Sequence, residues 1–142
     1  MSVDPARGMT IELSVQDDDL DELGHVNNAH YLRYAEAAAR AHSAARGFTL
    51  ATYRELGALP VVRRHEIRYR RPALPGERLR VTTELTRLDG RRAVRHTAIR
   101  RAHDDALLVE ADTEWVWVDT EGGRPVRVPG AVLAAFGVDS PR

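Results

Sequence analysis

Only one segment of this chain has the pattern of a long helix, and most of the remainder alternates in the way strands do. The segment 29–46 is rich in alanine, Asn27 or Asn28 can cap its start, and Gly47 can end it. Strand-like alternation covers the ranges 10–16, 61–71, 78–88, 92–101 and 106–118. One helix with five strands predicts an α+β fold, in which a curved antiparallel sheet packs on the helix.

Shorter signals complete this outline. Asp89-Gly90, between two strand segments, is typical of a hairpin, and 50–56 and 132–136 have the pattern of short helical turns. With no repeat or linker, we expect a single domain over 1–142, with flexible tails at 1–9 and 138–142. In the last strand, alternate residues share a face that we assign to the core: Val109, Ala111, Thr113, Trp115 and Trp117.

One helix cannot cover both faces and both edges of such a sheet. We therefore expect a homo-oligomer, built from a dimer that pairs sheet edges.

Composition excludes several classes of function. The 21 basic residues, all arginine, balance 21 acidic residues, so no global field favours nucleic acid or an acidic membrane surface. The absence of cysteine excludes thiol nucleophiles, disulfides and thiolate metal sites. No apolar signal core and no run of about 18 apolar residues is present. We expect a cytoplasmic protein that binds neither nucleic acid nor membrane.

The segment 17–28 concentrates aspartate and asparagine directly before the helix. Asp17, Asp19 and Asp21 alternate as in a calcium-binding EF-hand loop. However, Glu22 occupies the sixth position, where glycine is needed, and Asn28 the twelfth, where a bidentate glutamate is needed. The spacing therefore argues against calcium.

Zinc and serine chemistry fit no better. His25 and His30 are five residues apart, which does not place them on one helical face, and no HExxH motif occurs. Ser14 and Ser43 lie in a strand and a helix, and no GxSxG motif occurs. We expect no metal site.

A fourth interpretation combines a carboxylate with the start of a helix. Asp21, His25 and Asn27 have the spacing D-x-x-x-H-x-N. Unpaired N–H groups at a helix start polarise a bound carbonyl, and a nearby carboxylate activates water or attacks directly. These parts suffice to hydrolyse an activated acyl group such as a thioester. The same residues are also ordinary helix caps and loop residues, and spacing alone does not decide between the two.

A family resemblance favours the catalytic interpretation. The stretch DLDELGHVNNAHYLRYAEAA resembles the signature of the 4-hydroxybenzoyl-CoA thioesterase family, which has the hot-dog fold, and the similarity extends over residues 11–136. Tyr69, Pro72 and Gly76 are similar to downstream family positions. The signature matches at Asp19, Asp21, Gly24, His25, Val26, Asn27, Asn28, Tyr31 and Glu36.

The resemblance implies a fold, an assembly and a reaction. A long helix would be wrapped by a five-stranded antiparallel sheet, two protomers would share an active site, and dimers of many relatives pair into tetramers. Asp21 would be the general base or nucleophile. His25 and Asn27 would position the reactants, as in plant acyl-carrier-protein thioesterases. Coenzyme A would enter only as part of the substrate, without a further cofactor.

We expect substrate contacts from a wider set of residues. Backbone N–H groups near Asn28 and Ala29 would polarise the carbonyl. Tyr31 either lines an acyl pocket or belongs to the core, and Glu36 either supports the site or pairs with an arginine. Arg64 and Arg68 share a strand face that either binds coenzyme A phosphates or faces solvent beside Glu66. The full expected set is Gly24, Asn28, Ala29, Tyr31, Glu36, Arg64 and Arg68.

The expected activity is hydrolysis of acyl-CoA or acyl-carrier-protein thioesters. Two alternatives share the fold. A dehydratase acting on hydroxyacyl thioesters also needs a carboxylate and a histidine, and a non-catalytic protein would bind acyl-CoA without turning it over.

Overall fold

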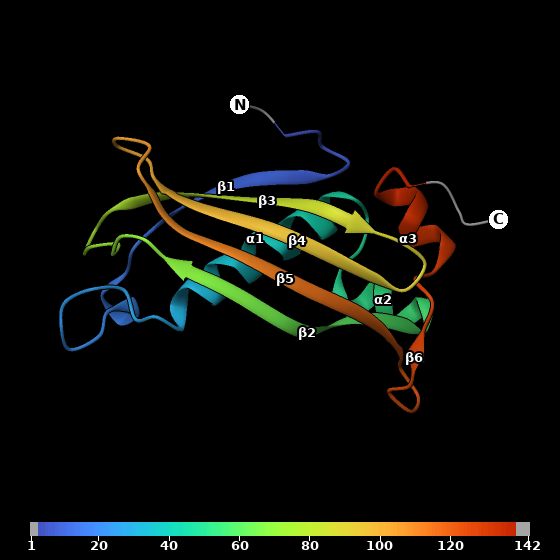
Figure 1. The fold of residues 1–142 in the computed structure, drawn as a ribbon. Helices are drawn as coiled ribbons and strands as arrows, with labels where there is room; N and C mark the ends of the chain where they lie inside the picture. The colour runs from blue at the N-terminus through green and yellow to red at the C-terminus, as the bar shows by residue number, and fades with distance from the viewer. Residues whose placement is uncertain (1–2, 139–142) are drawn as a thin grey trace.

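A computed structural model describes residues 3–138 of the chain, and it consists of one long helix packed against one antiparallel sheet. Helix α1 (His30–Ala45) lies behind the sheet in Figure 1. The strands lie in the order β1-β3-β4-β5-β2, and β6 pairs with the end of β5. Their bounds are β1 Gly8–Ser14, β2 Ala58–Tyr69, β3 Arg78–Leu88, β4 Arg92–Arg101, β5 Leu107–Asp119 and β6 Pro125–Val126. The predicted α+β arrangement is confirmed.

The observed elements differ from the predicted ones mainly at their ends. β3 and β4 have the predicted bounds, whereas β1 begins two residues early, so that residues 8 and 9 belong to the sheet and not to a tail. Residues 1–2 and 139–142 of the expected tails lie outside the described residues. Two short helices, α2 (Leu50–Leu56) and α3 (Gly130–Ala135), lie where helical turns were predicted. Strand β6 was not predicted, because two residues are too few to show alternation.

The start of α1 differs from the prediction, because the N-cap residue is Ala29, which makes no side-chain cap, and Asn27 instead stabilises the turn before the helix. The side-chain oxygen of Asn27 accepts a hydrogen bond from the Ala29 N–H at 2.9 Å, and its backbone oxygen accepts one from the His30 N–H at 2.8 Å. Gly47 adopts a φ of 93° just after the helix, where residues with a Cβ are disfavoured. The buried face of α1 is rich in alanine, which lets the sheet approach closely.

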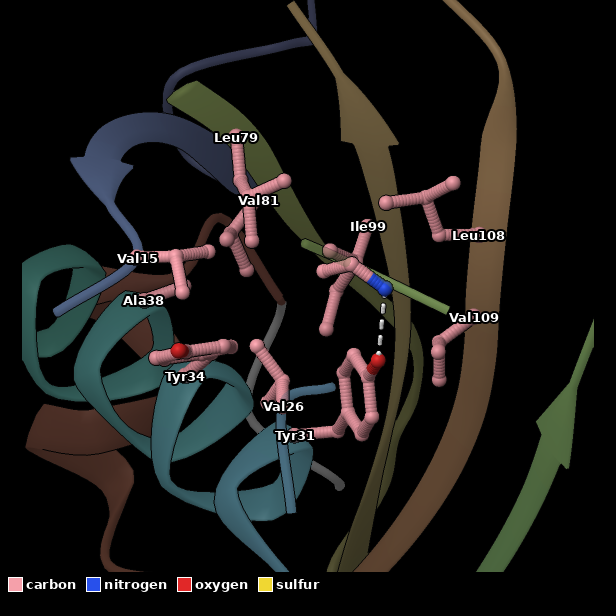
Figure 2. Close-up of a cluster of buried hydrophobic side chains, with 11 residues drawn as sticks. Val15, Val26, Tyr31, Tyr34, Ala38, Leu79, Val81, Ile99, Leu108 and Val109 are labelled. Carbon is pink, nitrogen blue, oxygen red and sulfur yellow. Dashed lines mark hydrogen bonds between the residues drawn. The ribbon is translucent and has the colours of Figure 1, made fainter. Parts of the chain in front are cut away.

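The core consists of two hydrophobic clusters, of which the first lies between α1 and the sheet. In the first, Tyr31 and Tyr34 project from the first turns of α1 toward Leu79, Ile99 and Val109 of the sheet (Figure 2). The second is formed by residues of α2, α3, the strands and the adjoining loops, without a residue of α1. The predicted core face of β5 is confirmed, since most of its residues are buried and Trp115 is partly buried. Members of the second cluster include Phe48, Tyr53, Leu85, Leu88, Trp117, Leu133 and Phe136.

A buried histidine on α1 joins the N-terminal segment to the sheet. The His42 side chain is fully buried; its Nε2 lies 2.9 Å from the Pro5 carbonyl oxygen, and its Nδ1 lies 3.0 Å from Nη1 of Arg95. Because a guanidinium only donates, Nδ1 must accept, and Nε2 carries the proton that is donated to Pro5. His42 is therefore neutral, and burial lowers its pKa below 6.5.

This histidine predicts a pH dependence of stability. Below about pH 6.5 His42 is protonated in the unfolded chain but stays neutral in the folded chain, because its folded pKa is lower. The free energy of unfolding therefore falls as pH falls from about 6.5 toward the folded pKa. Above that window His42 contributes no dependence. Urea unfolding between about pH 7.5 and 5.5 should show this fall, and it should be smaller in His42→Gln. Equal slopes in the two proteins would contradict the assignment.

Candidate active site

The acidic segment forms a closed loop in front of α1. A short 3₁₀ turn at Asp17–Asp19 is followed by a bridge that pairs Leu20 with Val26 in antiparallel fashion. Between them, the Asp21 N–H donates to the His25 carbonyl at 2.8 Å. Gly24 closes the loop with a φ of 75°, a conformation that favours glycine. Gly24 therefore has a conformational role in the loop, and its expected contact with substrate stays a prediction.

Asp21 uses one carboxylate oxygen for the loop and leaves the other free. Oδ1 accepts from the Leu23 N–H at 2.8 Å and lies 3.4 Å from the His25 N–H. Among the described residues, none donates a hydrogen bond to Oδ2. Asp21 is a partly buried residue, and the hydrogen bonds to Oδ1 hold its carboxylate in the loop.

Asp19 has a structural role that the sequence did not reveal. Its Oδ2 accepts from the Tyr34 hydroxyl at 2.8 Å and from the Gln16 N–H at 2.9 Å. Its Oδ1 lies 3.4 Å from Nε2 of His30, and its backbone oxygen accepts from the Asn27 N–H at 2.8 Å. Burial, followed by the hydrogen bond to Asp19, raises the pKa of Tyr34, so the phenol stays protonated and donates. Asp19 thereby anchors the loop on α1.

The residues directly before α1 are exposed, and Ala29, the N-cap residue, makes no side-chain cap to the first turn. Asn27, Asn28 and Ala29 all lie at this surface, next to the partly buried His25. The Ala29 N–H, which we expected to face substrate, is already bonded to the Asn27 side chain. Within the described residues, the Asn28 N–H donates no hydrogen bond and is the better candidate to polarise a carbonyl.

The hydroxyl of Tyr31 fastens the next loop to the helix. It accepts from the Ala73 N–H at 2.9 Å, the bond drawn as a dashed line in Figure 2. Ala73 in turn accepts from the Val26 N–H at 3.1 Å, and the Tyr69 hydroxyl donates to the Asn28 carbonyl at 3.0 Å. Tyr31 is only 2% exposed, which favours the core interpretation of this residue.

Tyr31→Phe should therefore destabilise the protein measurably. The variant leaves the buried Ala73 N–H without an acceptor, and we expect the free energy of unfolding to fall by about 1–3 kcal/mol in urea titrations. Tyr69→Phe is the matched control, because it also removes one hydroxyl but from a residue that is 47% exposed. An equal loss in both variants would argue against a special role for Tyr31.

Three other expected residues lie apart from the loop. Glu36 is exposed on α1 and pairs with Arg40, the alternative noted from the sequence. Arg64 and Arg68 lie on β2 and both pair with Glu66, at 3.0 and 3.1 Å. Ile67 packs on the first core cluster, so its neighbours in the alternation face away from α1. The structure does not bring Arg64 or Arg68 together with Asp21 in one chain.

The described residues carry neither of two other features. Among residues 3–138, no three His, Asp or Glu side chains gather as metal ligands would. In the same range, every helix is too short or too polar to cross a membrane.

Comparison with known proteins places this loop and helix in a family. A model of the thioesterase-like superfamily matches residues 15–136, from the end of β1 to the residue after α3. The chain belongs to this superfamily. The match covers the candidate loop, α1 and the whole sheet after β1, and it confirms the family resemblance of the sequence motif.

Individual relatives agree with this placement. A chloroplastic acyl-acyl carrier protein thioesterase of Arabidopsis thaliana is 29% identical over 127 residues, covering 89% of this chain and 67% of the relative. A second such enzyme from the same plant is 25% identical, covering 89% of this chain and 66% of the relative. The chain thus spans about two thirds of the length of these curated relatives.

Solved structures share the fold. A 1,4-dihydroxy-2-naphthoyl-CoA thioesterase from Synechocystis superposes with a TM-score of 0.84 at 22% identity, covering 91% of this chain and 95% of that one. The DHNA-CoA thioesterase of Staphylococcus aureus gives a TM-score of 0.79 at 19% identity, with 84% and 80% covered. At these identities the likeness establishes the hot-dog fold.

Proposed function

We propose that this protein hydrolyses acyl thioesters of coenzyme A or acyl carrier protein, with Asp21 as the catalytic carboxylate. The observation that carries the proposal is the free Oδ2 of Asp21, held in a closed loop beside the uncapped start of α1. Membership of the thioesterase-like superfamily supports the reaction class.

The proposed reaction uses the loop and the helix start together. The thioester carbonyl oxygen would lie at the start of α1, where the Asn28 N–H and the positive end of the helix dipole stabilise the developing oxyanion. Asp21 Oδ2 would accept a proton from water as the water oxygen bonds to the acyl carbon. The carbon–sulfur bond then breaks, and the thiolate leaves and takes up a proton. His25 and Asn27 would position the reactants.

The alternative role of Asp21 as a nucleophile uses the same oxygen. In that case Oδ2 would bond to the acyl carbon, the thiolate would leave, and water would hydrolyse the resulting anhydride. Both routes require a free carboxylate oxygen next to an oxyanion-binding helix start.

The edge strand β2 supports a homodimer. Several of its residues are exposed on this edge of the sheet, including Val61, Val62 and Tyr69. We infer that a second copy pairs along β2. Antiparallel pairing would bring the end of β2 that carries Tyr69, and with it Asn28, toward the beginning of β2 in the other copy. Light scattering should give twice the mass of one chain; a stable monomer at micromolar concentration would exclude this assembly.

A substrate panel tests the activity directly. Purified protein is incubated with acyl-CoA and acyl-carrier-protein thioesters, and free thiol and free acid are measured. Equal amounts of thiol and acid support the hydrolase. Formation of an enoyl thioester from a hydroxyacyl thioester would instead show a dehydratase, and saturable binding without either product would show a binding protein.

A further inference from the structure

The backbone between the acidic loop and α1 has almost all of its N–H groups occupied. The Val26 and Asn27 N–H groups donate to backbone carbonyls, at 3.1 and 2.8 Å. The Ala29 and His30 N–H groups both donate to Asn27, to its side-chain oxygen at 2.9 Å and to its carbonyl at 2.8 Å. Among the described residues, none accepts from the Asn28 N–H, which lies in the middle of this run.

The peptide unit between Asn27 and Asn28 directs the free N–H away from the helix. Its carbonyl oxygen, which belongs to Asn27, accepts from the His30 N–H in the first turn of α1. The peptide bond is trans, so its C=O and N–H groups point in opposite directions. The Asn28 N–H therefore points away from the first turn of α1, on a residue that is exposed.

The next peptide unit is held at both ends, and one of its partners is Tyr69 at the end of β2. Its carbonyl oxygen, on Asn28, accepts from the Tyr69 hydroxyl at 3.0 Å, and its N–H, on Ala29, donates to the Asn27 side chain. These two bonds fix the peptide after Asn28, while the bond from His30 fixes the peptide before it. The backbone torsions of Asn28, and with them the direction of its N–H, thus depend in part on the Tyr69 hydroxyl.

Packing holds the Tyr69 ring in place, although the residue is 47% exposed. Its ring centre lies 5.6 Å from that of Tyr31, with an angle of 67° between the two planes, which is an edge-to-face contact. Tyr31 is buried, and its own hydroxyl is bonded to the Ala73 N–H. Tyr69 therefore rests on the core with its ring and reaches the start of α1 with its hydroxyl.

We infer that Tyr69 is a positioning residue for the oxyanion donor of this site. Its hydroxyl holds the Asn28 backbone so that the Asn28 N–H donates to the acyl oxygen as negative charge develops there. The inference rests on the proposed hydrolysis of thioesters. The Tyr69 hydroxyl proton is already donated to the Asn28 carbonyl, so Tyr69 acts through Asn28. Its loss should lower the rate of the chemical step more than the binding of substrate.

Tyr69→Phe tests this role, because it removes the hydroxyl and keeps the ring. We expect kcat for thioester hydrolysis to fall roughly tenfold or more, with KM within about threefold of wild type. Thr10→Val is the matched control, since Thr10 also makes one exposed hydroxyl bond, to Thr82 at 2.8 Å, but on the opposite edge of the sheet. It should leave kcat unchanged. A kcat of Tyr69→Phe within about twofold of wild type would overturn the inference.

Infrared spectroscopy separates positioning from a general loss of structure. The probe is an acyl-CoA analogue in which a methylene group replaces the sulfur and the carbonyl carbon is carbon-13, so that it is not cleaved. A hydrogen bond from the Asn28 N–H lowers the stretching frequency of this carbonyl. We expect that lowering on binding to wild type and to Thr10→Val, and a smaller one in Tyr69→Phe. Equal frequencies in wild type and Tyr69→Phe, or no shift in wild type, would contradict the assignment.

The inference and the proposed function fail in different ways. Hydrolysis that requires Asp21 but is indifferent to Tyr69→Phe would keep the hydrolase and remove the role of Tyr69. If wild type released no thiol from any thioester, the hydrolase would fall, and a carbonyl shift that depends on Tyr69 would still support the contact between Asn28 and the acyl oxygen. Tyr69→Phe should stay folded, because the lost bond belongs to an exposed residue, and urea unfolding checks this.

Discussion

Asp21→Asn is expected to lower kcat/KM for thioester hydrolysis roughly a hundred- to ten-thousand-fold, which is the usual contribution of a positioned general base. The loop should remain folded, because both of its hydrogen bonds to this side chain are accepted by Oδ1, which asparagine retains. The change replaces only the free Oδ2 with an amide nitrogen that cannot accept a proton from water or attack carbon.

This expectation separates catalysis from folding. Thiol release gives kcat/KM, and urea unfolding shows whether the variant keeps the wild-type stability within about 0.5 kcal/mol. Glu22→Gln is the matched control, since it neutralises the adjacent, exposed carboxylate. Activity of Asp21→Asn within a few-fold of wild type would remove Asp21 from the chemistry.

Asp19→Ala is expected to act on stability. The substitution leaves the Tyr34 hydroxyl and the Gln16 N–H without their acceptor, and we expect the free energy of unfolding to fall by roughly 2–4 kcal/mol. The loss should be large because Tyr34 is buried under the loop. Activity should fall as well, since Asp19 positions the segment that carries Asp21.

The neighbour of Asp19 offers a control. Asp18 is exposed in the same short turn, and Asp18→Ala should change the free energy of unfolding by less than about 0.5 kcal/mol. Asp19→Asn keeps an oxygen acceptor and should recover much of the stability lost in the alanine variant. Similar losses in Asp18→Ala and Asp19→Ala would show that the anchoring bonds contribute little.

Much of the fold could be predicted because its elements follow simple periodicities. β3 and β4 alternate regularly and are joined by Asp89-Gly90, and their predicted bounds agree with the structure. The start of β1 was harder to predict, since Gly8 and Met9 enter the sheet through pairing with Glu84 and Thr83, which lie far away in sequence.

The candidate site was predicted as a segment, while the roles within it required coordinates. Asp19 and Asp21 are both acids of one motif. Only the structure shows that Asp19 accepts a hydrogen bond from the Tyr34 hydroxyl, whereas Oδ2 of Asp21 has no donor among the described residues. The position of Arg64 also depends on tertiary structure, because alternation groups residues by face without saying which face meets the helix. Arg95 appears as one strand arginine among many until His42 is placed beside it.

A single-turnover reaction in water enriched in oxygen-18 tests the central claim most directly. With protein in excess over an acyl-CoA that it binds, we predict one equivalent each of free thiol and free acid. The oxygen-18 enters the carboxyl group of the free acid, or, if an anhydride forms and water attacks its aspartyl carbon, the Asp21 carboxylate. An intact thioester after many turnover times, or loss of water from the acyl chain with the thioester retained, would contradict the account.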